Sequence, residues 1–393
     1  MAKYFFSSSF LLFLGNWIGQ VGLNWFVLTT YHNAVYLGLV NFCRLIPILL
    51  LSVWAGSIAD KYDKGLLLRI TISSSFIITA LLCLLTYSLN TIPIFIILLY
   101  ATFRGILSAV ETPVRQAVLP DLSSKISTTQ AVSFHSFIIN ICRSIGPAIA
   151  GGLIAVYHTP TTFLAQAVCY FIAAVLCIPV HFEVIVSQKE EKALPLKVVL
   201  NYFKSNLEGS QIFFTSIIIM ATGFSYTTVL PVLTNHIFPG QSQVFGIAMT
   251  FCAIGGIVAT IVLPSILKHL STVKMYYLSS ILFGMALLGI IIHHLVVMFI
   301  CITLIGLFSQ WARTTNRVYF QHSVKDCDRG KVLSIVMMDR GMIPLGSLIM
   351  SFFADMFGIL TTFTIMGIST ISISIIFYII QRISNMEESN NES

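Results

Sequence analysis

The chain has 393 residues, of which 56% are hydrophobic and 9% are charged, and its formal net charge at pH 7 is +7. A soluble protein has roughly 25% charged residues. A chain this apolar cannot bury its surface within a globule of its own length, which excludes a soluble protein and indicates a polytopic membrane protein.

Twelve apolar runs are long enough to cross a bilayer, since a membrane-spanning helix needs roughly 20 mostly apolar residues. We expect helices because the runs are continuous instead of alternating, and because lipid does not tolerate open strand edges. The first half of the chain places spans at residues 8–30, 34–58, 66–88, 92–113, 128–156 and 160–182. The second half places them at 211–235, 243–267, 275–293, 296–318, 331–354 and 360–381. The sequence therefore predicts an all-α membrane protein with twelve transmembrane helices.

Lysine and arginine are confined to every second connection between these spans. The other connections, near residues 32, 90, 158, 236–239, 293–294 and 358, contain neither residue type. Because basic loops stay in the cytoplasm, this bias predicts that both termini are cytoplasmic. The positive charge is spread over inner loops, so we expect no nucleic-acid partner. We expect a monomer that crosses the lipid bilayer of the bacterial inner (cytoplasmic) membrane many times.

The longest polar break runs from residue 183 to residue 209. Pro195 suits a helix start and Gly209 a helix end. The apolar residues between them follow helical spacing, namely Leu196, Val199, Leu200, Phe203 and Leu207. We expect a cytoplasmic amphipathic helix at the membrane surface. The predicted organisation is an N-terminal six-helix bundle (1–183), a linker (184–209), a C-terminal six-helix bundle (210–385) and a cytoplasmic tail (386–393).

The two halves of the chain repeat a sparse pattern about half a chain apart. The matched residues are Arg143 with Arg340, Pro147 with Pro344, and Arg115 with Arg317. Repeated halves with the substrate path between them are the architecture of a transporter. We therefore expect the two six-helix bundles to be pseudo-symmetric.

The fourth span carries a charged stripe. Its members recur at steps of three and four residues and so share one face of a helix: Tyr100, Arg104, Ser108, Glu111 and Arg115. Charge inside a membrane is costly, which makes each such residue a functional hypothesis. Two interpretations stay open here. One is a plain Glu111–Arg115 pair near the inner surface, and the other is a network in which Arg104 and Glu111 handle protons or substrate.

Two other spans carry polar residues. Asn16, Gln20 and Asn24 form an uncharged stripe on the first span, which we interpret as the lining of a cavity, with interhelical hydrogen bonds alone as the alternative. In the eleventh span Asp339 and Arg340 are adjacent, so they point about 100° apart and need not pair. Asp339 could titrate while Arg340 reaches another helix, or the two charges could compensate one another within the bundle.

Arginine outnumbers acid inside the spans. Arg44, Arg104, Arg143 and Arg340 lie well inside, and Arg313 lies nearer an end. This surplus favours an anionic ligand. The predicted substrate cavity is formed by Asn16, Gln20, Asn24, Arg104, Arg143, Tyr226, Arg313 and Arg340. The candidates for proton coupling are Glu111 and Asp339.

The motifs of enzymes are missing from the sequence. It has no GxxxxGK[ST] phosphate loop, HExxH or GxSxG, so we expect neither an enzyme nor a direct ATP-driven pump. We expect an ion gradient or the substrate's own gradient to supply the energy, with no cofactor. The histidines are scattered over different loops and no CxxC pair occurs, so we expect no metal site.

The stretch GSIADKYDKGLLLR, Gly56–Arg69, concentrates charge between the second and third spans. It resembles the loop between helices 2 and 3 of the major facilitator superfamily, Gly-x-Leu-Ala-Asp-Arg-x-Gly-Arg-Lys. The positions that match in kind are Gly56, Ile58, Ala59, Asp60, Lys61 and Lys64. Asp63 makes the stretch similar to the branch that contains the enterobactin exporter. The segments 111–122, 133–155 and 328–348 also resemble that branch.

This resemblance covers nearly the whole chain and implies a twelve-helix fold with alternating access. It also implies export of a small acidic metabolite, a siderophore, by proton antiport. A multidrug efflux transporter, an importer of a ferric siderophore and a non-transporting receptor or scaffold remain alternatives. We interpret Gly56, Asp60, Lys61 and Lys64 as a gating loop, in which Asp60 caps and pairs with a neighbouring helix end.

Overall fold

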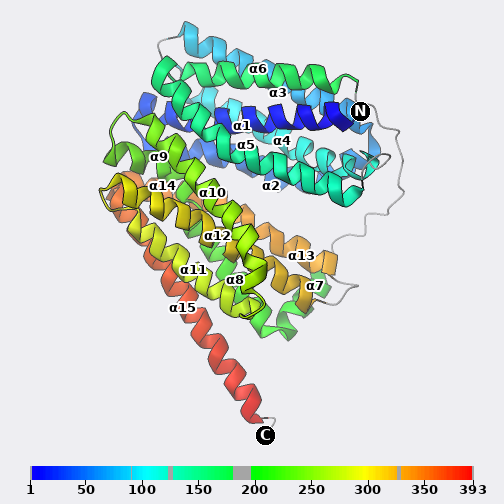
Figure 1. Ribbon diagram of the computed structural model, residues 1–393, viewed down its shortest axis with the longest axis vertical. Coiled ribbons are helices and arrows are strands. Elements are labelled where there is room, and N and C mark those ends of the chain that lie inside the picture. Colours follow the sequence, from blue (N-terminus) through cyan, green and yellow to red (C-terminus); the bar gives the residue numbers. More distant parts are fainter. Residues whose placement is uncertain (1, 90, 123–126, 180–195, 325–328, 392–393) are drawn as a thin grey trace. The chain divides into compact units, whose positions relative to one another are not determined.

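The computed structural model describes residues 2–89, 91–122, 127–179, 196–324 and 329–391. Over these ranges the chain forms fifteen α-helices and two short 3-10 helices, with no strand (Figure 1). The prediction of an all-α fold is confirmed. The part of the linker between residues 184 and 195 lies outside the described residues.

The first half of the chain forms a bundle of six long helices (Figure 1). Their bounds are α1 Ala2–Tyr31, α2 Ala34–Lys61, α3 Lys64–Ser88, α4 Ile94–Val118, α5 Thr128–Tyr157 and α6 Pro160–Cys177, with a 3-10 turn, η1, at Pro120–Leu122. Helix α1 packs on α5 and α6, α2 packs on α4, and α3 packs on both α4 and α6. Every helix of this bundle therefore contacts at least one that is not its sequence neighbour.

The second half has more and shorter elements (Figure 1). They are α7 Leu196–Ser205, α8 Leu207–Thr222, α9 Tyr226–Ile237, α10 Ser242–Ile266, α11 Thr272–Gly289, α12 Leu295–Ser323, α13 Arg329–Val336, η2 Met337–Gly341, α14 Met342–Phe357 and α15 Ile359–Asn391. Helix α11 packs on α12 and α15, and α8 packs on α14 and α15.

By their contacts the helices gather into two compact units. The first unit comprises Met1–Lys189 and Leu230–Thr250, and the second comprises Glu190–Val229 and Phe251–Ser393. The predicted boundaries at residues 183, 210 and 385 remain predictions.

Eleven helices in the described ranges are long and apolar enough to cross a membrane. Two predicted runs are interrupted. The run 211–235 divides into α8 and α9 at residues 223–225, where Gly223 and Ser225 are poor helix formers. The run 331–354 divides at η2, because Pro344 clashes with a regular helical carbonyl four residues earlier. The helix after η2, α14, has 16 residues.

The predicted amphipathic helix is present as α7, but its predicted end at Gly209 is wrong. Helix α7 ends at Ser205, and Asn206 caps the next helix by accepting a hydrogen bond from the Gly209 backbone N–H at 2.8 Å. Gly209 therefore lies in the first turn of α8. A side-chain cap at Asn206 is the stronger boundary signal, because it satisfies a helix N–H that would otherwise have no partner.

Two charged residues of the turn between α2 and α3 make hydrogen bonds at helix ends. Asp63 caps α3, accepting from the backbone N–H groups of Gly65 at 2.6 Å and Leu66 at 3.1 Å. Lys64 donates to the carbonyl of Ala117 at 3.1 Å, in the last turn of α4. A cation is favourable at that helix end. The side chains of the other predicted gating residues, Gly56, Asp60 and Lys61, lie outside what the structure describes.

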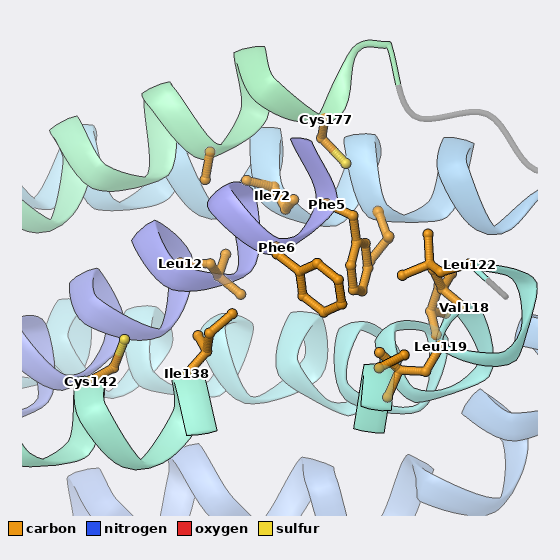
Figure 2. Packing of buried hydrophobic residues seen from close by; sticks show 14 of the residues in the cluster. Phe5, Phe6, Leu12, Ile72, Val118, Leu119, Leu122, Ile138, Cys142 and Cys177 are labelled. Carbon is orange, nitrogen blue, oxygen red and sulfur yellow. The ribbon is translucent and has the colours of Figure 1, made fainter. Parts of the chain in front are cut away.

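A core of apolar side chains binds one end of α1 to its neighbours (Figure 2). Phe5, Phe6 and Leu12 of α1 are buried in it. Their partners come from the other helices of the bundle and include Ile72, Val118, Ile138, Cys142 and Cys177 (Figure 2). The cysteines of this core are free thiols.

Helices α2 and α4 approach one another closely at Gly105. A Cβ atom at this position would lie 2.3 Å from the backbone carbonyl oxygen of Arg44. Only glycine fits, because neither backbone can yield without moving its helix. Gly105 thus sets the spacing between the helices that carry Arg44 and Arg104.

Replacing Gly105 with alanine should separate α2 from α4 and destabilise the first unit. Overpacking of this kind costs about 1–3 kcal/mol. Thermal unfolding of the purified protein in detergent measures the loss. Gly152→Ala is the matched control, because nothing lies within 4 Å of a Cβ there. Equal melting temperatures for the two variants would contradict the assigned role of Gly105.

Candidate functional site

The first unit has a partly open cavity of about 250 Å³. Its wall is built by side chains of α1, α2, α4 and α6, and the polar and charged ones include Asn16, Gln20, Arg44, Arg104, Glu111 and Gln166. The structure thus brings together four residues that the sequence predicts as functional: Asn16, Gln20, Arg104 and Glu111.

Arg104 is the most firmly held polar side chain of this wall. It is 5% exposed and donates to the Ser75 hydroxyl at 2.6 Å and to the Tyr170 hydroxyl at 2.8 Å. A third contact, at 3.5 Å, reaches Asn16 Oδ1. The guanidinium carbon also lies 4.9 Å from the centre of the Tyr170 ring. These neutral groups hold the positive charge from three neighbouring helices, α1, α3 and α6.

The acceptors around Arg104 are themselves held by a chain of hydrogen bonds. Gln166 Nε2 donates to the Tyr170 hydroxyl at 2.9 Å, and Gln166 Oε1 accepts from Tyr100 at 3.3 Å. Gly19 makes room for this chain, because a Cβ there would fall 1.9 Å from the Gln166 side chain. The network therefore fixes the Tyr170 oxygen toward Arg104.

Arg44 shares the cavity but is held differently. In the part of the chain that the structure describes, its one hydrogen bond is from Nη2 to Asn41 Oδ1, at 3.3 Å. Asn41 in turn donates to Asn24 Oδ1 at 3.0 Å and to the Leu37 carbonyl at 3.0 Å. Asn24 is buried and does not line the cavity, so it supports the wall through Asn41.

Among the described residues, neither Arg44 nor Arg104 has a carboxylate within 4.0 Å. The acid on the cavity wall, Glu111, instead pairs with Arg115, whose Nε lies 2.9 Å from Glu111 Oε1. Arg115 also donates to the Ser9 hydroxyl at 2.7 Å. Glu111 is thus both a cavity residue and one half of a buried ion pair. Arg44 and Arg104 therefore place two positive charges on the wall, and within the described chain neither is in direct contact with a carboxylate.

The second unit holds a smaller group of charges around Asp339. Asp339 Oδ2 accepts from Ser216 at 2.6 Å and from Asn316 at 3.3 Å. Arg313, Arg317 and Arg340 lie with Asp339 around a space of about 10 Å³. Asp339 is 5% exposed whereas Arg340 is exposed, so the adjacent residues point to different environments as their spacing predicts.

The remaining predicted cavity residues are not among the described residues that line the cavity of the first unit. Arg143 is half-buried on α5 and does not line it. Tyr226 is buried in the second unit, with its hydroxyl 3.0 Å from Cys252 Sγ. Arg313 donates to Gln310 at 2.8 Å and lies over the Phe224 ring. A substrate role for these residues and for Arg340 remains a prediction.

The structure adds several residues that the predicted site omits. Arg44 is recognisable in the sequence as an arginine inside a span. The sequence does not show whether its side chain lines a cavity or packs against another helix. Gln166 and Tyr170 lie four residues apart in the sixth span, which places them on one face of a helix. That spacing is the signal that could have found them.

A comparison with protein families identifies the class of protein. The transmembrane secretion effector family, a branch of the major facilitator superfamily, matches residues 3–393. The chain belongs to this family. It is therefore a multi-pass membrane transporter and not an enzyme.

Individual relatives agree with this assignment. The chain is 74% identical over 394 residues to the staphyloferrin A transporter of Staphylococcus aureus (strain NCTC 8325 / PS 47), covering 100% of this chain and 99% of the relative. It is 19% identical to macrolide efflux protein A of Streptococcus pyogenes, covering 94% and 93% of the two chains. The crystal structure of the nucleoside transporter NupG has the same fold, with a TM-score of 0.77 at 14% identity over 96% of this chain and 98% of that one.

The Glu111–Arg115 pair should stabilise the first unit strongly. Removing one partner of a buried pair costs about 3–5 kcal/mol, since the other charge is left uncompensated. We expect Glu111→Gln to lower the melting temperature, and the double variant Glu111→Gln/Arg115→Met to recover part of the loss. Gln116→Ala, on an exposed residue of the same helix, is the control. An unchanged melting temperature for Glu111→Gln would show that the pair is not structural.

Proposed function

We propose that the protein exports a small acidic siderophore across the cytoplasmic membrane by alternating access and proton antiport. Two comparisons support this proposal. The family is named after secretion, and this chain is 74% identical to the staphyloferrin A transporter over its full length. Staphyloferrin A is therefore the first substrate to test.

The observation that carries the proposal is the unneutralised pair Arg44 and Arg104 on one cavity wall. An arginine inside a membrane costs about 2.5–3.5 kcal/mol on insertion scales. Hydrogen bonds to neutral groups can offset this cost, but they leave the positive charge without a counter-charge. An anionic substrate supplies the missing counter-charge. The same two charges disfavour a lipophilic cation, which makes multidrug efflux the weaker candidate despite the likeness to the macrolide efflux protein.

We assign proton coupling to Asp339 ahead of Glu111. Glu111 already forms an ion pair with Arg115 at 2.9 Å, so a proton on Glu111 would cost the protein that pair. The Asp339 carboxylate accepts hydrogen bonds from two neutral groups, Ser216 and Asn316, and is buried. A buried carboxyl held by neutral donors can exchange a proton without breaking a direct ion pair. We further propose that the protein acts as a monomer with both termini in the cytoplasm.

Inside-out membrane vesicles provide the direct test of export. With an acidic lumen, we expect vesicles that contain the protein to accumulate iron-free staphyloferrin A, and a protonophore to abolish this accumulation. Vesicles without the protein are the control. Uptake of the ferric siderophore into right-side-out vesicles, without movement of the iron-free form in inside-out vesicles, would establish import instead.

Asp339→Asn should separate substrate movement from proton coupling. We expect the variant to exchange labelled for unlabelled siderophore but to lose accumulation driven by the pH gradient, because the amide of asparagine does not ionise and so cannot carry a proton through the cycle. Asp355→Asn, which neutralises an exposed acid on α14, is the matched control. If Asp339→Asn accumulates siderophore at the wild-type level with unchanged pH dependence, Asp339 is not the coupling residue.

A further inference from the structure

The two cavity arginines differ in how many of their hydrogen-bond donors the protein uses. Arg104 contacts three acceptors, on α1, α3 and α6. Arg44 makes one hydrogen bond within the described chain, at 3.3 Å to Asn41. A guanidinium group has five N–H donors in a planar fork. Most of the donors of Arg44 are therefore left for a ligand, whereas those of Arg104 are largely occupied.

We propose that Arg44 binds a carboxylate of the transported molecule through its planar fork, and that Arg104 supplies a fixed positive charge beside it. This inference rests on the proposed function and names the group that the cavity recognises. The planar fork of arginine matches a carboxylate through two parallel hydrogen bonds. Arg104 favours the ionised form of that carboxylate without having to release its own partners.

Asn41 is the positioning residue for Arg44. Its amide nitrogen donates to Asn24 and to the Leu37 carbonyl, so its oxygen must face Arg44. The close approach of α2 and α4 at Gly105 brings the Arg44 segment against Arg104. Both guanidinium groups line the same small cavity, so their like charges repel one another. A bound carboxylate relieves this repulsion, which adds to its affinity.

The cavity is small for a whole siderophore. Sites for drug-sized ligands occupy roughly 300–1,000 Å³, and this cavity measures about 250 Å³. We therefore expect it to hold one carboxylate-bearing end of the molecule, while the rest extends through the open side of the cavity. A short dicarboxylate that resembles such an end should therefore bind by itself.

The test uses the purified full-length protein in detergent with glutarate as the probe. We expect glutarate to raise the melting temperature of the wild type, and its uncharged dimethyl ester to leave it unchanged. Arg44→Gln should abolish the glutarate effect. Arg44→Lys, which keeps the charge but loses the fork, should weaken glutarate binding about tenfold or more. Arg382→Gln, which removes an exposed arginine, is the control.

Transport kinetics separate binding from folding. For staphyloferrin A we expect Arg44→Lys and Asn41→Ala to raise KM about tenfold or more with kcat nearly unchanged, because they remove binding and not the transport cycle. A wild-type glutarate response and KM in Arg44→Lys would overturn the inference and leave export standing. Absence of siderophore transport by the wild type would overturn the proposed function, and the glutarate measurement would still decide the role of Arg44.

Discussion

The first unit is organised around the buried guanidinium of Arg104, which must find hydrogen-bond acceptors on neighbouring helices. It donates to Ser75 on α3 and Tyr170 on α6, and it contacts Asn16 on α1. Each hydrogen bond to a charged group contributes about 1.5–3 kcal/mol, which is enough in sum to offset the cost of an arginine in a spanning helix. The protein can therefore hold this charge without an acid, and the charge remains available to a substrate.

Small residues make this arrangement possible by letting the helices approach. On α1, a Cβ added at Gly15, Gly19 or Gly22 would collide with residues of α6. On α4, a Cβ added at Gly105 would collide with the backbone of α2. Helices in lipid associate through such close packing, since the surrounding lipid is as apolar as the helices. The consequence for function is that polar side chains from four helices meet around one narrow cavity.

Much of the fold follows from the length and continuity of the apolar runs, and their polar stripes predicted part of the site. Asn16, Gln20 and Asn24 were expected at a cavity with Arg104, and Glu111 was expected to couple protons. Asn16, Gln20, Arg104 and Glu111 line the cavity of the first unit, whereas Asn24 does not. The interruptions at residues 223–225 and at η2 were not expected. Glycine, serine and proline weaken the helix at these points, but the hydropathy of the run stays high and so does not reveal the break.

Other features of the site depend on contacts between residues that a local sequence pattern does not predict. Glu111 has Arg115 one turn away and also borders the cavity, so helical spacing alone left its role open. The structure shows that Glu111 does pair with Arg115, at 2.9 Å. The positions of Arg44 and Arg143 read alike in sequence, as single arginines in apolar runs. They differ in the structure, because Arg44 lines the cavity of the first unit and Arg143, on α5, is not among its lining residues.

The central claim is that Arg44 and Arg104 neutralise an anionic group of the substrate. A structure of the protein with iron-free staphyloferrin A tests it most directly. The account predicts ligand density inside the cavity of the first unit, with a carboxylate oxygen within hydrogen-bond distance of Arg44 and beside Arg104. Ligand bound elsewhere, with both guanidinium groups keeping only their present protein contacts, would contradict it.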